Sequence, residues 1–266
     1  MTNLINLAFE KAKKEKRPAL LTYTVAGDNT KKNSLDILRS LSNIADICEL
    51  GFPHNTPIAD GGQIQTSAYR AIKNGIKIND TFDIVKKLKE KKSDIPIILM
   101  GYYNMIYQLG ENNFLNKCKN SGVDGIIVVD LPWPENKFFS KKCKKKNICF
   151  VQLISPTTSH DRAKKIINDS HNMVYYISML STTGGKLKVS PNEILSKFKK
   201  IKKINPKKNC VIGFGITKES IGKLKFADGL VVGSAICKEI TKSLIKRQNP
   251  VTNIRKNVIK LKNIIS

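Results

Sequence analysis

Eight short apolar segments recur along the chain, separated by segments with the residue spacing of amphipathic helices. The apolar segments do not alternate with polar residues, as expected for strands buried on both faces of a parallel sheet. They span residues 20–25, 46–51, 95–100, 125–129, 148–154, 173–178, 210–213 and 229–232. The helical spacing covers residues 34–43, 83–91, 113–121, 135–145, 161–168, 192–203 and 218–225.

This alternation over 266 residues predicts an α/β fold, a (β/α)₈ TIM barrel. The main alternative is a doubly wound open sheet, which usually has a G-x-G-x-x-G turn after its first strand; residues 27–29 (GDN) do not match that turn. No linker or change of composition divides the chain, so we expect one barrel domain over residues 1–266. Three extra helices are expected: 1–16 on the barrel floor, 60–74 inserted after the second strand, and 252–265 closing the fold.

The net charge of +26 is the second conspicuous feature, from 47 Lys and Arg against 21 Asp and Glu. A nucleic-acid partner is one interpretation. However, only six of the basic residues are Arg, the residue suited to bidentate contacts with bases. The lysine runs at 86–89, 141–146 and 197–208 fall on expected outer helices. We therefore favour a solvated, Lys-rich exterior produced by compositional drift, with no nucleic-acid partner.

Other sequence features bear on metals, membranes and location. The six cysteines form no CxxC pair and the three histidines are scattered, so we expect no metal site. No apolar run reaches the roughly 18 residues needed to cross a membrane. The first 16 residues are charged and amphipathic rather than a secretory signal. We therefore expect a cytoplasmic protein with reduced thiols and no membrane partner.

Two carboxylates are candidates for catalysis at the mouth of the barrel. Glu49 lies inside the second apolar segment, and burial there would raise its pKa into the range useful for general acid–base chemistry. Asp60 follows a loop stiffened by Pro53 and Pro57, and it is a candidate for the second carboxylate. The alternatives are a Glu49 bonded to loop amides and an Asp60 that caps a helix.

Glycine-rich turns follow the seventh and eighth apolar segments, at residues 213–215 and 233–234, and each leads into an expected helix. Backbone N–H groups at such turns can approach an anion, and these loops often bind phosphate in this fold. Residues 181–186 form a further polar stretch, a candidate lid or third phosphate contact. Simple tight turns are the alternative interpretation.

On these residues the chain resembles the tryptophan synthase alpha subunit family, from about residue 20 to 240. The matching stretches are TVAGD (24–28), ELGFP (49–53), PIADG (57–61), LMGYYN (99–104), GVDG (122–125), DLP (130–132), SPTT (155–158), VYYIS (174–178), GFGI (213–216) and VGSA (232–235). The resemblance implies a lyase of tryptophan biosynthesis that cleaves indole-3-glycerol phosphate to indole and glyceraldehyde 3-phosphate by a retro-aldol reaction.

The resemblance also implies roles for individual residues. Glu49 matches the acid–base carboxylate, and Asp60 matches the carboxylate that bonds the indole N–H. Tyr175 matches a residue beside the catalytic glutamate, and Tyr23, Tyr102, Val129 and Leu153 match the indole slot. The matches to the rest of the substrate and phosphate pocket are Thr183, Gly184, Gly213, Phe214, Gly215, Gly233 and Ser234. The chain is expected to need no cofactor, and its implied partner is a pyridoxal-phosphate beta subunit in an alpha2-beta2 heterotetramer.

Three departures from the family pattern concern loops. The family commonly has Asp where this chain has Thr56, in a loop that meets the beta subunit. In the loop after the sixth strand, Met179 replaces an Arg and Ser181 replaces a Gly. These changes leave open a second interpretation, in which the chain is a non-catalytic or degenerate alpha subunit that mainly activates its partner. A basic nucleic-acid-binding barrel is the third.

Overall fold

The computed structural model describes residues 3–91, 94–177, 190–213, 216 and 218–266. Within these ranges all the paired strands are parallel and form one sheet in the order β5-β4-β3-β2-β1-β9-β8-β7-β6. The strands are β1 (Ala19–Val25), β2 (Ile47–Gly51), β3 (Ile97–Gly101), β4 (Gly125–Val128), β5 (Cys149–Phe150), β6 (Gln152–Ile154), β7 (Met173–Ile177), β8 (Asn209–Gly213) and β9 (Gly229–Val232).

The two outermost strands of this order, β5 and β6, are consecutive in the chain and flank Val151. β5 pairs with β4 and β6 pairs with β7, while the Val151 N–H donates to the Ile126 carbonyl oxygen at 2.9 Å. They are therefore two halves of the single strand expected at 148–154. The sheet forms a nearly closed barrel, and the predicted (β/α)₈ architecture is confirmed.

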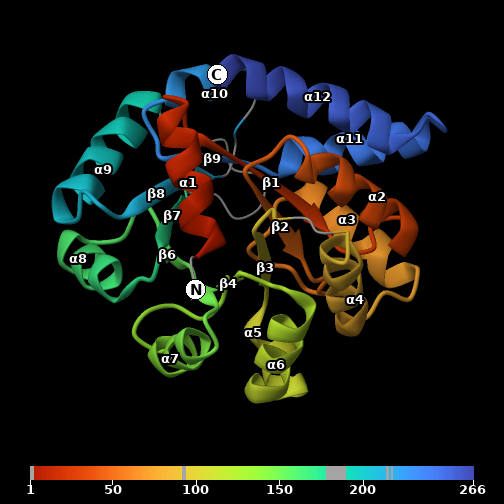
Figure 1. Ribbon diagram of the computed structural model, residues 1–266, viewed down its shortest axis with the longest axis horizontal. Coiled ribbons are helices and arrows are strands. Elements are labelled where there is room, and N and C mark those ends of the chain that lie inside the picture. The colour runs from red at the N-terminus through yellow and green to blue at the C-terminus, as the bar shows by residue number, and fades with distance from the viewer. Residues whose placement is uncertain (1–2, 92–93, 178–189, 214–215, 217) are drawn as a thin grey trace.

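Helices surround the strands (Figure 1). They are α1 (Leu4–Lys14), α2 (Lys31–Ser42), α3 (Gly62–Lys73), α4 (Ile78–Lys89), α5 (Tyr103–Leu109), α6 (Glu111–Ser121), α7 (Lys137–Lys145), α8 (His160–Asp169), α9 (Pro191–Ile204), α10 (Lys218–Ile221), α11 (Ser234–Ile245) and α12 (Pro250–Ile265). The extra N-terminal helix, the helix inserted after the second strand and the closing helix are all present.

The structure differs from the helix predictions in three places. Helix α4 begins at Ile78, five residues before the predicted start, because the Asp80 carboxylate accepts from the Lys77 N–H at 2.8 Å and closes the first turn. Helix α5 was not predicted; it has only seven residues and ends at Gly110, whose φ of 80° breaks the helix. The helix expected at 218–225 is α10 followed by a 3₁₀ turn at Gly222–Leu224.

The core has two layers. Alternate strand residues point into the barrel, and the inner layer includes Leu21, Tyr23 and Val25 of β1. The outer layer lies between the strands and the helices. Helix α1 covers the floor of the barrel: Ile5 and Phe9 belong to the inner layer and reach close to the first residues of β4 and β9. The floor is therefore sealed, and the carboxyl ends of the strands form the mouth.

An ion pair ties together three segments near the mouth. Arg70 of α3 donates from Nε and Nη2 to the two carboxylate oxygens of Asp28, at 2.7 and 2.9 Å. Asp28 follows β1 and is only 1% exposed. Arg70 also donates to the hydroxyls of Thr241 on α11, at 2.8 Å, and Ser67, at 3.1 Å. The pair therefore fixes α3 and α11 relative to the end of β1.

We expect Arg70→Met to lower the free energy of unfolding by about 3 kcal/mol, because it leaves the buried Asp28 carboxylate without its partner. Urea unfolding followed by circular dichroism would measure this change. The control is Arg255→Met on the exposed side of α12, which should stay within about 0.5 kcal/mol of the parent. A loss below about 1 kcal/mol for Arg70→Met would contradict the stabilising role of the pair.

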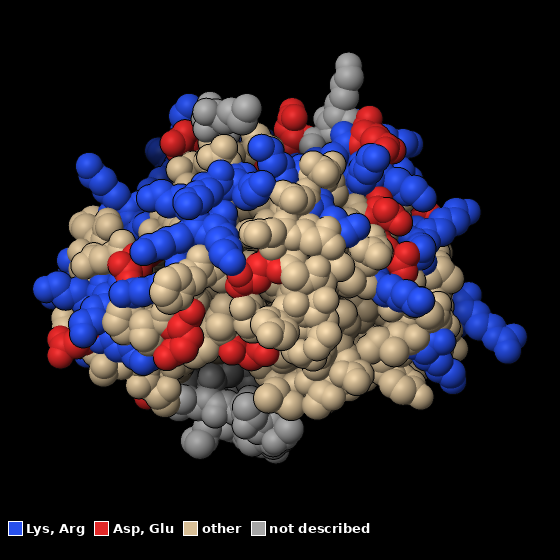
Figure 2. All heavy atoms as spheres, turned by 90° about the horizontal axis from the view of Figure 1, so that it is seen from below, with Lys and Arg blue, Asp and Glu red and all other residues tan. Residues whose placement is uncertain are grey.

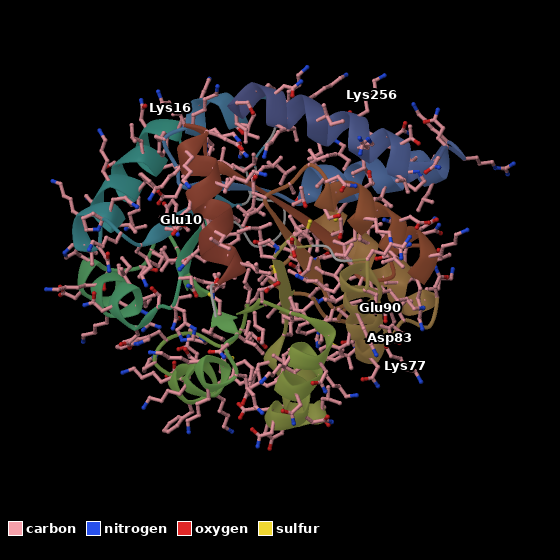
Figure 3. The ribbon with its side chains drawn as sticks, in the orientation of Figure 1. Glu10, Lys16, Lys77, Asp83, Glu90 and Lys256 are labelled. Atoms are coloured by element: carbon pink, nitrogen blue, oxygen red, sulfur yellow. The ribbon has the colours of Figure 1, made fainter. Side chains whose placement is uncertain are left out.

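Charged side chains lie mainly on the outside. Basic residues are spread over several parts of the face shown in Figure 2, with acidic residues and uncharged areas between them. The charged residues Lys77, Asp83 and Glu90 are exposed on the outer side of the ribbon (Figure 3). The five lysines at 141–146 are also exposed or partly exposed, and Cys143 is the buried member of that run. This distribution agrees with a solvated exterior. In the described part of the chain, no helix is long and apolar enough to cross a membrane.

Candidate active site

The inward-facing residues at the upper ends of the strands include most of the predicted site residues that the structure describes. Tyr23 on β1 lies beside Glu49 on β2 in the strand register. Leu153 on β6 lies beside Tyr175 on β7 in the same way. Glu49 has the same strand parity as Ile47, which belongs to the inner core layer. Its carboxylate therefore points into the barrel rather than toward the surrounding helices.

Glu49 is the most strongly perturbed carboxyl group of this mouth. The residue is 1% exposed, and neither of its carboxylate oxygens has a hydrogen-bond partner among the residues that the structure describes. Burial raises the pKa of the Glu49 carboxyl to about 8, because the charged form loses its hydration. The alternative of a carboxylate bonded to loop amides is wrong for the described residues. Glu49 is protonated at neutral pH and can donate a proton.

Asp60 lies at the same mouth in a more polar environment. Its Oδ2 accepts a hydrogen bond from the Tyr102 hydroxyl at 3.1 Å, whereas Oδ1 has no partner among the described residues. Burial raises the pKa of Asp60 to about 6, and the Tyr102 hydrogen bond acts in the opposite direction. Asp60 is not a helix cap, since Gly61 is the N-cap of α3 and makes no side-chain cap bond. The two carboxyl groups therefore have separated pKa values, with Asp60 the more acidic.

Two adjoining hollows connect these carboxyl groups. The aspartate hollow contains Asp60, Tyr102 and Val129, and the glutamate hollow contains Glu49, Tyr175, Gly233 and Ser234. Both are also lined by Tyr23, Ile64 and Met100, which makes them neighbours along one cleft. Leu153 lies outside both hollows, in a groove that Val129 also lines.

Two tyrosines reach across the mouth over glycines. A Cβ atom on Gly51 would come within 2.1 Å of the Tyr23 hydroxyl oxygen, and one on Gly213 would come within 1.9 Å of the Tyr175 hydroxyl oxygen. Any side chain at these glycines would displace the tyrosines. Gly213 therefore makes room for Tyr175 at the end of β8, in addition to the phosphate role expected from the sequence.

The structure describes only some of the residues predicted to bind the phosphate. Gly233 is the N-cap of the 12-residue helix α11, and Ser234 is its first residue. The start of this helix opens onto the glutamate hollow, where the first N–H groups have no acceptor within the helix and the helix dipole favours an anion. The predicted residues Thr183, Gly184, Phe214 and Gly215 lie outside the described residues, as do Met179 and Ser181.

The lining residues that were not identified from the sequence include His54, Ile64 and Met100. The His54 ring stacks on the Tyr102 ring with centroids 4.7 Å apart, so it covers the partner of Asp60. Met100 has the inward strand parity of Ile98, and Ile64 is a buried residue in the first turn of α3. Strand parity and helical spacing were the available signals for these two. Thr56 is exposed, and its N–H donates to His54 Nδ1 at 3.0 Å.

Metal ligands are not gathered at this mouth: the described residues hold no group of three His, Cys, Asp or Glu side chains suited to a metal ion. The fold and site therefore define the class of TIM-barrel enzymes, with two carboxyl groups of different pKa beside a helix N-terminus that favours anions. Comparison with known proteins narrows this class. A family model described as "Tryptophan synthase alpha chain" matches residues 9–266, and the chain belongs to this family.

Similar proteins carry the same description. A tryptophan synthase alpha chain from Pelagibacter ubique is 72% identical over 264 residues, covering 99% of this chain and 100% of the relative. One from Methanocaldococcus jannaschii is 39% identical, covering 89% and 84% of the two chains. The crystal structure of the alpha subunit from Legionella pneumophila has a TM-score of 0.91 at 29% identity, covering 100% and 99%. A tryptophan synthase complex from Pyrococcus furiosus contains a chain with a TM-score of 0.81 at 38% identity, covering 91% and 97%.

Members of this family are lyases of tryptophan biosynthesis that cleave indole-3-glycerol phosphate. The alpha chain carries no cofactor, and pyridoxal phosphate belongs to the beta subunit. The family thus identifies the substrate that the two hollows and the start of α11 would have to bind.

Proposed function

We propose that this chain cleaves indole-3-glycerol phosphate to indole and glyceraldehyde 3-phosphate, with Glu49 as the acid–base group and Asp60 as the group that stabilises positive charge. The observation that carries this proposal is the pair of carboxyl groups at the mouth of the barrel. One is buried without a partner among the described residues, and the other is held by a tyrosine hydroxyl.

Glu49 first acts as an acid. Its protonated carboxyl group, present at neutral pH because burial raises the pKa to about 8, delivers a proton to the ring carbon that bears the three-carbon chain. The ring becomes an indolenine cation. The Glu49 carboxylate then accepts the proton of the adjacent hydroxyl as that carbon becomes an aldehyde. The bond between the ring and the chain breaks, and its electron pair restores the aromatic indole.

Asp60 stabilises the cationic intermediate. Ionised at pH 7, its carboxylate accepts a hydrogen bond from the indole N–H and offsets the charge that develops on the ring. The free Oδ1 is available for this bond, while the Tyr102 hydroxyl orients the group through Oδ2. The difference between the two environments is the means by which one site holds a proton donor and an anion at the same pH.

We place the substrate along the cleft in one direction. The indole ring lies in the aspartate hollow against Tyr102, Val129 and Met100, where a flat apolar ring is well buried. The phosphate lies at the start of α11 with Gly233 and Ser234, and the three-carbon chain passes Glu49 between them. Val129 continues into the groove with Leu153 at the edge of this slot.

We also propose a pyridoxal-phosphate beta subunit as the partner, in a heterotetramer of two alpha and two beta chains. The relative from Pyrococcus furiosus, solved as a tryptophan synthase complex, supports this partner. The exposed Thr56 stands in the loop expected to meet it. A cytoplasmic location fits an enzyme of amino-acid biosynthesis, and the described cysteines are unpaired and buried.

A single assay tests the proposed function. Purified chain is incubated with indole-3-glycerol phosphate, and indole and glyceraldehyde 3-phosphate are measured over time, with and without a beta subunit carrying pyridoxal phosphate. We expect both products in equal amounts and a faster reaction when the beta subunit is present. A chain that releases no indole but still accelerates the beta subunit would be a non-catalytic partner, and the proposal would be wrong.

A further inference from the structure

Tyr23 occupies the junction between the two hollows. Its side chain starts beside the phosphate end, where a Cβ on Gly233 would lie 3.2 Å from the Tyr23 Cβ. It ends over Gly51, where the hydroxyl oxygen would lie 2.1 Å from an added Cβ. Tyr23 therefore spans the part of the cleft that separates the anion site from the two carboxyl groups.

The Tyr23 side chain is largely buried, and its hydroxyl opens onto this cleft. The residue is 5% exposed and lines both hollows, and its hydroxyl makes no hydrogen bond to any of the described residues. Burial raises the pKa of Tyr23 well above its usual value, and the neighbouring Asp60 and Glu49 charges act in the same direction. The hydroxyl therefore stays protonated and is available as a donor near both carboxyl groups. A donor that opens onto the cleft, without a hydrogen bond to the described residues, is available to a polar group of the ligand.

We propose that the Tyr23 hydroxyl hydrogen-bonds an oxygen of the three-carbon chain of the substrate and holds that chain against Glu49. This inference rests on the proposed function and adds a positioning residue to it. The indole ring itself offers a single polar group, its N–H, for which Asp60 is the better partner because it is an anion. The phosphate lies beyond Gly233, at the start of α11. The oxygens of the three-carbon chain are the polar substrate atoms that pass the middle of the cleft.

The KM values for the two products, measured in the reverse reaction, distinguish this role from that of a residue that only lines the indole slot. The reaction is run in the direction of synthesis, from indole and glyceraldehyde 3-phosphate, with Tyr23→Phe. We expect the KM for glyceraldehyde 3-phosphate to rise about three- to tenfold, as for the loss of one neutral hydrogen bond. The KM for indole should stay within twofold, because the phenyl ring remains. Cleavage should lose kcat/KM by a similar factor.

Stability provides a second measurement on the same variant. Removal of a hydroxyl that has no partner should leave the thermal unfolding midpoint unchanged or slightly raised. The matched control is Tyr107→Phe on α5, whose side chain is exposed, and it should change neither KM.

An unchanged KM for glyceraldehyde 3-phosphate would overturn the inference, and so would a rise in the KM for indole. A clear fall in the unfolding midpoint would also overturn it, by showing that the hydroxyl has a structural partner. These failures differ from failure of the proposed function. If Glu49→Gln is inactive while Tyr23→Phe behaves as the parent, only the role of Tyr23 is wrong.

Discussion

Glu49→Gln should lower kcat for indole release by a factor of about 10³, because an amide can neither donate the proton to the ring carbon nor accept the hydroxyl proton. The amide is nearly the same size and shape as the carboxyl group, so substrate binding should change little. The measurement is steady-state indole release over a range of substrate concentrations. The effect should therefore appear in kcat, with KM within a few-fold of the parent.

The control for this substitution is Glu90→Gln, at an exposed position at the end of α4. It should keep full activity. If Glu49→Gln retained more than about one tenth of the parent kcat, another group would have to supply the proton. The acid–base role would then be wrong even if the fold were intact.

The same variant should be more stable than the parent above acidic pH. Burial raises the pKa of Glu49 to about 8 in the folded chain, whereas an unfolded glutamate titrates near its ordinary value of 4.5. A raised folded pKa gives stability that is present below pH 4.5 and is lost as the pH rises toward 8. Glutamine has no such dependence. Its advantage over Glu49 should grow between these pH values and reach on the order of a few kcal/mol. Unfolding in urea at pH 5 and pH 8 would show whether the difference grows.

Local signals explain which parts of the fold could be predicted. The strands could be predicted because each is buried on both faces and is therefore a continuous apolar run. The run at residues 97–100 can be recognised without knowing which strands pair with it. Helix α5 was missed because seven residues are too few to show a helical spacing, and the first turn of α4 was missed because it depends on a local polar contact. The Asp80 carboxylate on the Lys77 N–H is one such contact, and hydrophobic spacing does not reveal it. The strand expected at 148–154 is present, and only its interruption at Val151 was not visible in the sequence.

Some features of the site could also be predicted from local sequence, and others could not. Glu49 could be predicted from its neighbours in sequence, since a carboxylate inside an apolar strand is unusual wherever it occurs. The partner of Asp60 could not, because Tyr102 is 42 residues away and their contact depends on the closed barrel. The position of the Tyr23 hydroxyl over Gly51 depends on one side-chain conformation, so the sequence predicted the ring in the indole slot without its polar end.

Asp60→Asn should reduce kcat/KM for cleavage by about 10²-fold, since a neutral amide cannot offset the charge of the indolenine cation. It should also change the pH dependence of the reaction. In the parent, kcat/KM should rise as Asp60 ionises near pH 6 and fall as Glu49 loses its proton near pH 8, giving a bell-shaped profile. The residual activity of Asp60→Asn should keep the fall near pH 8 and lack the rise near pH 6. The control is Asp130→Asn, where the exposed carboxylate accepts from the Tyr103 N–H, and it should keep both limbs. A rise near pH 6 that persists in Asp60→Asn would assign that ionisation to another group and would remove the reason for placing the anion at Asp60.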